Sequence, residues 1–351
     1  WDWMAGRGYH ADANNANNFN GADNTFWRKL ISAPDTLRQR MVLALSEIFV
    51  VSMVGLPVAW RGFCIAHYVD LLEQHAFGNY RQLLEAVTLS TGMGNYLNLR
   101  GNQKEDTKTG RVPDENYARE VLQLFSIGLY QLNPDGSVIT DGNGKPLESY
   151  TQDSITGLAR VFTGWDYDGY NKADPGFQQR PLVFNAARHS AQEKRFLGVT
   201  IAAGTPGTDA MRIALDSIAN HPNVGPFFCR QLIQRLVCSN PGPAYIARVA
   251  AVFNNNGNGV RGDLQAVVRA ILLDEEARNP SNLGNPMVGK VREPVVRFLN
   301  WARAFNASSA SDAWRIGDTS DAGTKLGQSP LHSPSVFNFF LRLLYFSFPE
   351  S

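Results

Sequence analysis

The stretch TLRQRMVLALSEIFVVS, residues 36–52, decides the fold class, because its apolar residues recur at the spacing of a helix. Pro34, just before this stretch, suits the first turn of a helix. Gly55 and Pro57 interrupt the pattern. The residues that carry the repeat are Leu37, Met41, Ala44, Leu45, Ile48 and Phe49. We therefore expect an amphipathic helix in this part of the chain.

Helical patterns of this kind continue over most of the sequence. Asn79, Thr151 and Asp263 stand where a helix N-cap is expected, since their side chains accept backbone N–H donors. We expect less than about a fifth of the residues in strands, against a typical helix content near one third. The further helical segments are 56–76, 79–90, 113–128, 150–165, 208–219, 223–237, 245–253, 263–277 and 291–305.

Two segments do not follow the helical pattern. Residues 131–149 are dense in Gly, Asp, Asn and Pro and predict turns or a small hairpin. Residues 166–207 are irregular, with a strand predicted over 195–201. The sequence thus predicts a mainly α protein, an irregular multi-helix bundle with a small turn- and hairpin-rich insertion. We expect residues 1–351 to form one large helical domain.

The composition excludes several classes of protein. The 351 residues carry 33 Lys and Arg against 32 Asp and Glu, a net charge of +1, so a nucleic-acid-binding protein is not expected. No apolar run approaches the roughly 18 residues of a membrane-spanning helix. Cys64, Cys229 and Cys238 are too few for a disulfide framework. Either one pair is bridged or all three are small buried thiols.

The helix expected from Pro113 carries a polar face that suggests chemistry. Glu115 and Arg119 are four residues apart, as are Asn116 and Glu120, so the four side chains share that face. One interpretation is a carboxylate held by Arg119 beside a second carboxylate, suited to acid–base catalysis. The alternative is a structural ion-pair network or a solvated face. If Arg119 neutralises a buried carboxylate, Arg119→Ala costs about 3–5 kcal/mol.

Two further groups of side chains complete the candidate site. His189, with Lys194 nearby, either contributes to a basic pocket for an anionic group or bonds to loop backbone. Trp165 and Tyr167 either stack on sugar rings or pack in the core. The candidate catalytic residues are Glu115, Glu120, Arg119 and His189. The candidate binding residues are Asn116, Tyr117, Lys194, Trp165 and Tyr167.

No metal or cofactor site is expected. The histidines form no HxxxH or HExxH pattern that would bind zinc. Asp135, Asp141, Asn143 and Glu148 lie in the turn-rich segment, but their spacing does not match a calcium-binding EF-hand loop. These residues are more simply explained by turn geometry.

Two blocks of sequence resemble a known family. DENYARE with LQLFSIGLY (114–130) and YTQDSITGLARVFTGW (150–165) are similar to the bacterial domain-of-unknown-function family 1800. Ser190 stands where the family usually has Asp, which weakens a His–Asp interpretation of His189. The supporting segments are LRQRMVLALSEIFVVS (37–52), KRFLG (194–198), HPNVGPFFCRQLIQRLV (221–237) and SPSVFNFF (333–340).

The resemblance implies a mostly helical, exported bacterial protein, often encoded beside a second exported protein. The family offers no established catalytic residues. Three hypotheses of function follow. The first is a binding or assembly protein that engages an extracellular polymer or a partner protein. The second is a hydrolase-type enzyme on such a polymer that uses the Glu, Arg and His residues. The third is a structural subunit of an extracellular assembly.

The C-terminal tail bears on the third hypothesis. It carries an apolar run over residues 341–348. An exposed run of this kind would favour aggregation. We expect it to pack on the chain's own helices, or alternatively against a second copy in a homo-oligomer.

Overall fold

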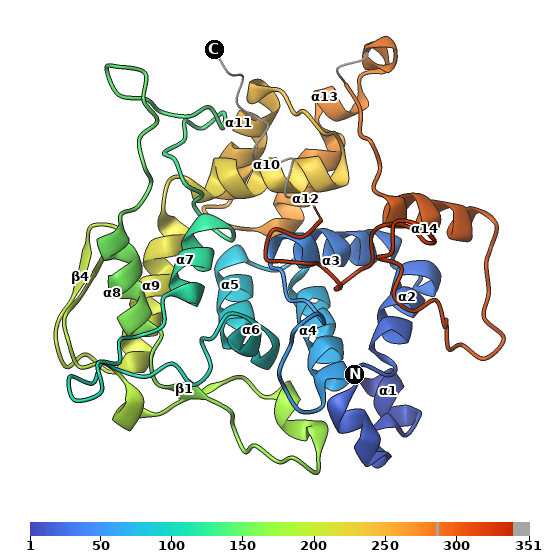
Figure 1. Ribbon diagram of the computed structural model, residues 1–351. Coiled ribbons are helices and arrows are strands. Elements are labelled where there is room, and N and C mark those ends of the chain that lie inside the picture. Colours follow the sequence, from blue (N-terminus) through green and yellow to red (C-terminus); the bar gives the residue numbers. More distant parts are fainter. Residues whose placement is uncertain (286–287, 340–351) are drawn as a thin grey trace. The chain divides into compact units, whose positions relative to one another are not determined.

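The computed structural model describes residues 1–285 and 288–339 (Figure 1). Within these residues, helices α1 to α14 and two antiparallel sheets of two strands each make up most of the regular structure. Helical periodicity therefore predicted the fold class correctly, and the mainly α fold is confirmed. The apolar run at 341–348 lies outside the described residues, and its packing stays a prediction.

The chain divides into two compact units. Unit 1 comprises Trp1–Glu73, Gly169–Arg180 and the described residues from Arg292 onward. Unit 2 comprises Gln74–Asp168 and Pro181–Val291. The expectation of one large domain over 1–351 concerns how these units combine, and it stays a prediction.

The helices of unit 1 begin where the local sequence allows the backbone to turn. The helix predicted over 36–52 begins at Thr36 and leaves Pro34 outside, because Asp35 takes the N-cap position. The helix predicted from residue 56 begins only at Arg61, since Trp60 adopts a left-handed φ of 56°. The α-helices of this unit are α1 (Asp2–Gly6), α2 (Ala22–Ser32), α3 (Thr36–Ile48), α4 (Arg61–His75), whose last two residues belong to unit 2, and α14 (Pro294–Ala304).

The helices of unit 2 begin at the predicted caps. The side chains of Asn79, Thr151 and Asp263 each accept a backbone N–H from the first turn that follows. The helix predicted over 263–277 is divided, because Asp274 ends one helix and caps the next. The α-helices are α5 (Tyr80–Leu89), α6 (Thr91–Tyr96), α7 (Asn116–Gln123), α8 (Gln152–Val161), α9 (Gly207–Asn220), α10 (Val224–Leu236), α11 (Pro243–Asn254), α12 (Leu264–Leu273) and α13 (Glu275–Arg278).

The strands of unit 2 are short and lie in its irregular part. β1 (Trp165–Asp166) pairs with β2 (Val183–Phe184), and β3 (Lys194–Phe196) pairs with β4 (Val199–Ile201). The strand predicted over 195–201 is therefore wrong as one strand. Leu197 and Gly198 both have positive φ, 46° and 76°, which reverses the chain into a hairpin.

Two expectations from composition can be compared with the structure. Cys64, Cys229 and Cys238 are buried free thiols, and burial raises the pKa of Cys238 to about 11. Among the described residues, we find no helix of the length and apolarity that crossing a membrane requires.

Candidate functional site

The candidate carboxylates lie at the start of α7 and within it. The helix begins at Asn116 rather than at Pro113, because the Asp114 carboxylate accepts the Asn116 backbone N–H at 2.8 Å. Asn116 is half-buried. Glu115 thus occupies the N-cap position, outside the helix proper. The four polar residues do not form one uniform face, because their burial differs.

Glu115 joins α7 to α8. Its carboxylate accepts hydrogen bonds from Thr156 Oγ1 and Gln152 Nε2, both at 2.8 Å, and from Arg119 at 3.3 Å. Arg119 is 42% exposed. An exposed pair of this kind contributes about 0.2–1 kcal/mol, so the pair with Glu115 does not meet the condition for a cost of 3–5 kcal/mol. Glu115 serves the contact between two helices.

Glu120 has a different environment from Glu115. It is 8% exposed, and its Oε2 atom has no hydrogen-bond partner within the described part of the chain. Burial raises the pKa of its carboxyl group, although the nearby Arg119 acts in the opposite direction. A carboxyl group that holds its proton closer to neutral pH is able to act as a proton donor.

Tyr150 lies near Glu120 and was not identified from the sequence. Its hydroxyl donates to Gln123 Oε1 at 3.3 Å. Burial raises the pKa of Tyr150 to about 12, and the charge of Glu120 adds to that effect. No sequence pattern pointed to Tyr150, since it lies 30 residues after Glu120 and only the fold brings the two together.

Tyr117 cannot meet a ligand at the surface, which corrects its assignment as a binding residue. Its side chain is fully buried. Its hydroxyl lies 2.6 Å from Thr88 Oγ1, and its ring packs edge-on against Phe162 with centroids 4.9 Å apart. Burial raises the pKa of Tyr117 well above its ordinary value. Tyr117 belongs to the core of unit 2.

His189 is buried at a distance from the carboxylates. Its Nδ1 lies 2.9 Å from the carbonyl oxygen of Thr163, and its ring packs against Phe184. Thr163 follows the C-terminal end of α8, whereas Glu115 bonds to Thr156 in the middle of that helix. At 1.5 Å per residue, these contacts are separated by roughly 10 Å. In the described structure, no hydrogen bond or ion pair joins His189 to Glu115 or Glu120.

The environment of His189 predicts a pH effect on stability. Burial lowers its pKa below the ordinary value of 6.5. The unfolded chain therefore binds a proton below pH 6.5 while the folded chain resists it, and stability falls as the pH drops through this range. In His189→Gln we expect the loss of unfolding free energy relative to wild type to be larger at pH 7.5 than at pH 5. Urea unfolding at both pH values measures this, and equal losses would contradict it.

Lys194 is directed inward rather than toward an anionic ligand. It is completely buried, and its Nζ donates to the carbonyl oxygens of Ser190 and Gln192 at 2.9 and 3.0 Å. Burial lowers its pKa, while the charge of Glu105 opposes this shift. The ammonium group holds the loop before β3 in place, which corrects its assignment to an open binding site.

Trp165 and Tyr167 belong to the framework of unit 2. Trp165 is 5% exposed and its ring packs against Phe184, so the indole ring is not presented to a polymer. The hydroxyl of Tyr167 donates to Asn95 Oδ1 at 2.9 Å, and the guanidinium group of Arg100 lies over its ring. Packing in the core, the alternative left open for Trp165, describes what is observed.

A group of aromatic rings, two of them exposed, occurs instead on α14 of unit 1 and at its C-cap. We call Phe298, Trp301 and Phe305 the aromatic strip. Trp301 is 57% and Phe305 is 73% exposed, while Phe298 packs inward against the buried Trp27. The ring centroids of Phe298 and Trp301 are 6.1 Å apart, and those of Trp301 and Phe305 are 5.9 Å apart. The opposite face of the helix is buried through Val295, Val296, Leu299 and Ala302.

The strip is held on a fixed support. Arg303, on the same helix, donates to the carbonyl oxygens of Leu30 and Ala33 at 2.8 and 3.0 Å and to Thr36 Oγ1 at 3.0 Å. These bonds anchor α14 to the junction of α2 and α3. The sequence could have indicated the strip, because the aromatic residues at positions 298, 301 and 305 follow helical spacing. They lie on a different side of the helix from its buried apolar residues.

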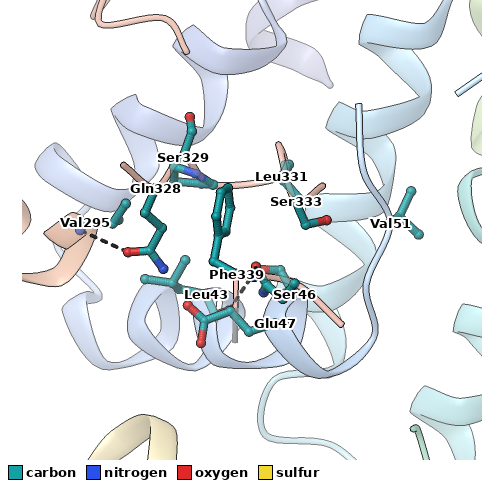
Figure 2. Close-up of a pocket in the computed structure, with 12 residues that line it drawn as sticks. Leu43, Ser46, Glu47, Val51, Val295, Gln328, Ser329, Leu331, Ser333 and Phe339 are labelled. Atoms are coloured by element: carbon teal, nitrogen blue, oxygen red, sulfur yellow. Dashed lines mark hydrogen bonds between the residues drawn. The ribbon is translucent and has the colours of Figure 1, made fainter. Parts of the chain in front are cut away.

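A small cavity in unit 1 is unrelated to the predicted site (Figure 2). Its lining includes Leu43 and Glu47 of α3 together with Gln328 and Phe339. Its volume of about 10 Å³ holds at most one water molecule. It is therefore too small for a substrate.

Among the described residues, no group of three or more His, Cys, Asp or Glu side chains is arranged to hold a metal ion.

Comparison with known proteins identifies the family. No curated protein and no solved structure matches the chain. The model of the family described as "Protein of unknown function (DUF1800)" matches residues 5–345. This range includes both blocks that carried the resemblance, and the chain therefore belongs to the DUF1800 family.

Proposed function

We propose that this protein is an exported binding protein that engages an extracellular polymer through the aromatic strip on α14. The observation that carries the proposal is the exposure of Trp301, in the last turn of α14, and of Phe305, its C-cap residue, at 57% and 73%. Large exposed apolar side chains that adjoin one another are typical of binding surfaces. The exported location implied by the family resemblance is part of the proposal.

The spacing of the rings supports a polymer as the ligand. The centroids of the two exposed rings, Trp301 and Phe305, are 5.9 Å apart, close to one helical turn of about 5.4 Å. A polysaccharide presents one ring per unit, and the C–H groups of a sugar face carry partial positive charge. They are attracted to the negative face of an aromatic ring. Two exposed rings about one helical turn apart thus fit two successive units of a repeating ligand.

Removal of the strip tests this proposal. We expect the double variant Trp301→Ala/Phe305→Ala to bind at least about 100-fold more weakly to the polymer that wild type retains, because both rings would stack on it. Binding is measured by sedimentation with insoluble chitin, cellulose and peptidoglycan and by calorimetry with soluble polysaccharides.

The matched control removes two other exposed apolar side chains. Val112 and Leu283 are both exposed and lie in unit 2. Val112→Ala/Leu283→Ala is expected to bind as wild type does. Equal binding by the strip variant and wild type would contradict the proposal, as would retention of no polysaccharide by wild type.

A second candidate function, acid catalysis on an extracellular polymer, is favoured by Glu120 of unit 2. Its buried carboxyl group has a raised pKa and an Oε2 without a hydrogen-bond partner in the described structure. If it donates a proton to a leaving group, Glu120→Gln lowers the release of soluble fragments by at least about 100-fold, as loss of general acid catalysis does. Binding through α14 would be unchanged. An equal rate of release in both proteins would contradict this candidate.

A further inference from the structure

We infer that the polymer bound by the aromatic strip is an anionic polysaccharide, whose carboxylate or sulfate groups pair with Arg297 and Arg292. This inference rests on the proposed function, because it names the class of polymer that the strip would bind. It depends on the charges that surround the strip.

Arg297 lies on the side of α14 that bears the strip. It precedes Trp301 by four residues, so the two side chains are neighbours along the helix surface. Its side chain is exposed. Arg292, just before the helix, is also exposed. Within the described residues, neither arginine forms an ion pair.

Three other arginines of unit 1 are already engaged. Arg28 binds Asp312 through its Nε, and Arg38 lies 3.4 Å from Asp35. Arg303 is occupied by backbone carbonyl groups. The guanidinium groups of Arg297 and Arg292 are therefore available for an external anion, which the planar fork of an arginine binds through two parallel hydrogen bonds.

No acidic side chain offsets this charge along the helix. Residues 294–305 contain neither Asp nor Glu. Glu293, which precedes them, is buried. The exposed side of α14 thus combines aromatic faces with positive charge alone. An acidic polysaccharide offers the complement of both, a ring for each aromatic face and an anionic group beside it.

A chemically matched pair of ligands tests the charge. Polygalacturonate and its fully methyl-esterified form share the same sugar rings, but only the first carries carboxylates. We expect wild type to bind polygalacturonate at least about tenfold more tightly at low ionic strength. This preference disappears near 1 M salt, where the screening length falls to about 3 Å. Calorimetry with both polymers measures it.

Variants assign the preference to the two arginines. Arg292→Gln/Arg297→Gln is expected to bind both polymers equally, with the affinity that wild type shows for the ester. Arg269→Gln, which removes an exposed arginine on α12 of unit 2, serves as the matched control and keeps the preference. Unchanged preference in the double variant would overturn the inference.

The remaining outcomes separate this inference from the proposed function. Equal binding of both polymers by wild type, lost in Trp301→Ala/Phe305→Ala, would support the proposed function and overturn the anionic preference. Binding of neither these nor any other polysaccharide would overturn both. Poly-L-glutamate provides the remaining comparison. If it binds as tightly as polygalacturonate, the ligand is recognised as an acidic chain without sugar rings, and the inference is wrong.

Discussion

Replacement of Gly157 by alanine is expected to lower the free energy of unfolding by about 3–5 kcal/mol, the range of severe core disruption. Gly157 lies in α8, where it faces the backbone of β3. A Cβ atom at this position would lie 1.9 Å from the carbonyl oxygen of Arg195 and 2.7 Å from its carbonyl carbon. Backbone atoms cannot move aside by a change of rotamer, so the helix and the hairpin must separate.

The sign of this effect is opposite to helix propensity. In an open helical position, glycine to alanine stabilises by up to about 1 kcal/mol. Gly6 provides the matched control, because it also lies in a helix and a Cβ there has no atom within 4 Å. Urea unfolding of both variants measures the difference. A Gly157→Ala protein as stable as Gly6→Ala would show that α8 and β3 do not approach so closely.

The second large effect is expected at Asn223, for which Asn223→Ala should cost about 3 kcal/mol. This buried residue precedes α10 and fixes the segment that follows α7. Its Oδ1 accepts the Leu132 N–H at 3.0 Å, and its Nδ2 donates to the carbonyl oxygens of Ile127 and Tyr130 at 2.9 and 2.7 Å. Each buried backbone group left unpaired costs about 1–3 kcal/mol, and the lower end applies to the bonds of Leu132 and Tyr130, which are only partly buried.

Two further variants show whether the hydrogen bonds are responsible. Asn223→Asp keeps the acceptor for Leu132 but places a carboxylate against two carbonyl oxygens, so we expect it to be destabilised as well. Asn258→Ala changes an exposed asparagine and should leave the midpoint of urea unfolding within error of wild type. A midpoint of Asn223→Ala equal to that of Asn258→Ala would contradict the prediction.

The helices were predictable because their signals are local. Apolar residues spaced three and four apart define a buried face within one segment, as in α3, and a capping side chain acts within two or three residues. Asn79, Thr151 and Asp263 were therefore identified correctly. The prediction of a helix or strand failed where a single residue adopts an unusual backbone conformation. Trp60 and Leu197 adopt positive φ, which apolar side chains seldom do.

The candidate site shows what local signals leave open. Spacing placed Glu115 and Glu120 on one polar face, but neighbours distant in sequence bury Glu120 and leave Glu115 to bond with α8. The same holds for the three hydrogen bonds of Asn223, which join residues more than 90 positions apart. Local periodicity carries no information about contacts at such separations.

The sequence by itself determined the family, the mainly α fold class, most helices and their caps, since each depends on residues within a few turns of one another. Only the tertiary structure decided which polar and aromatic side chains face solvent. Trp165 follows α8 and Trp301 lies within α14, yet Phe184 covers the first and the second stays exposed. Burial is set by packing between segments far apart in the chain, and so the surface available for binding emerges only from the fold.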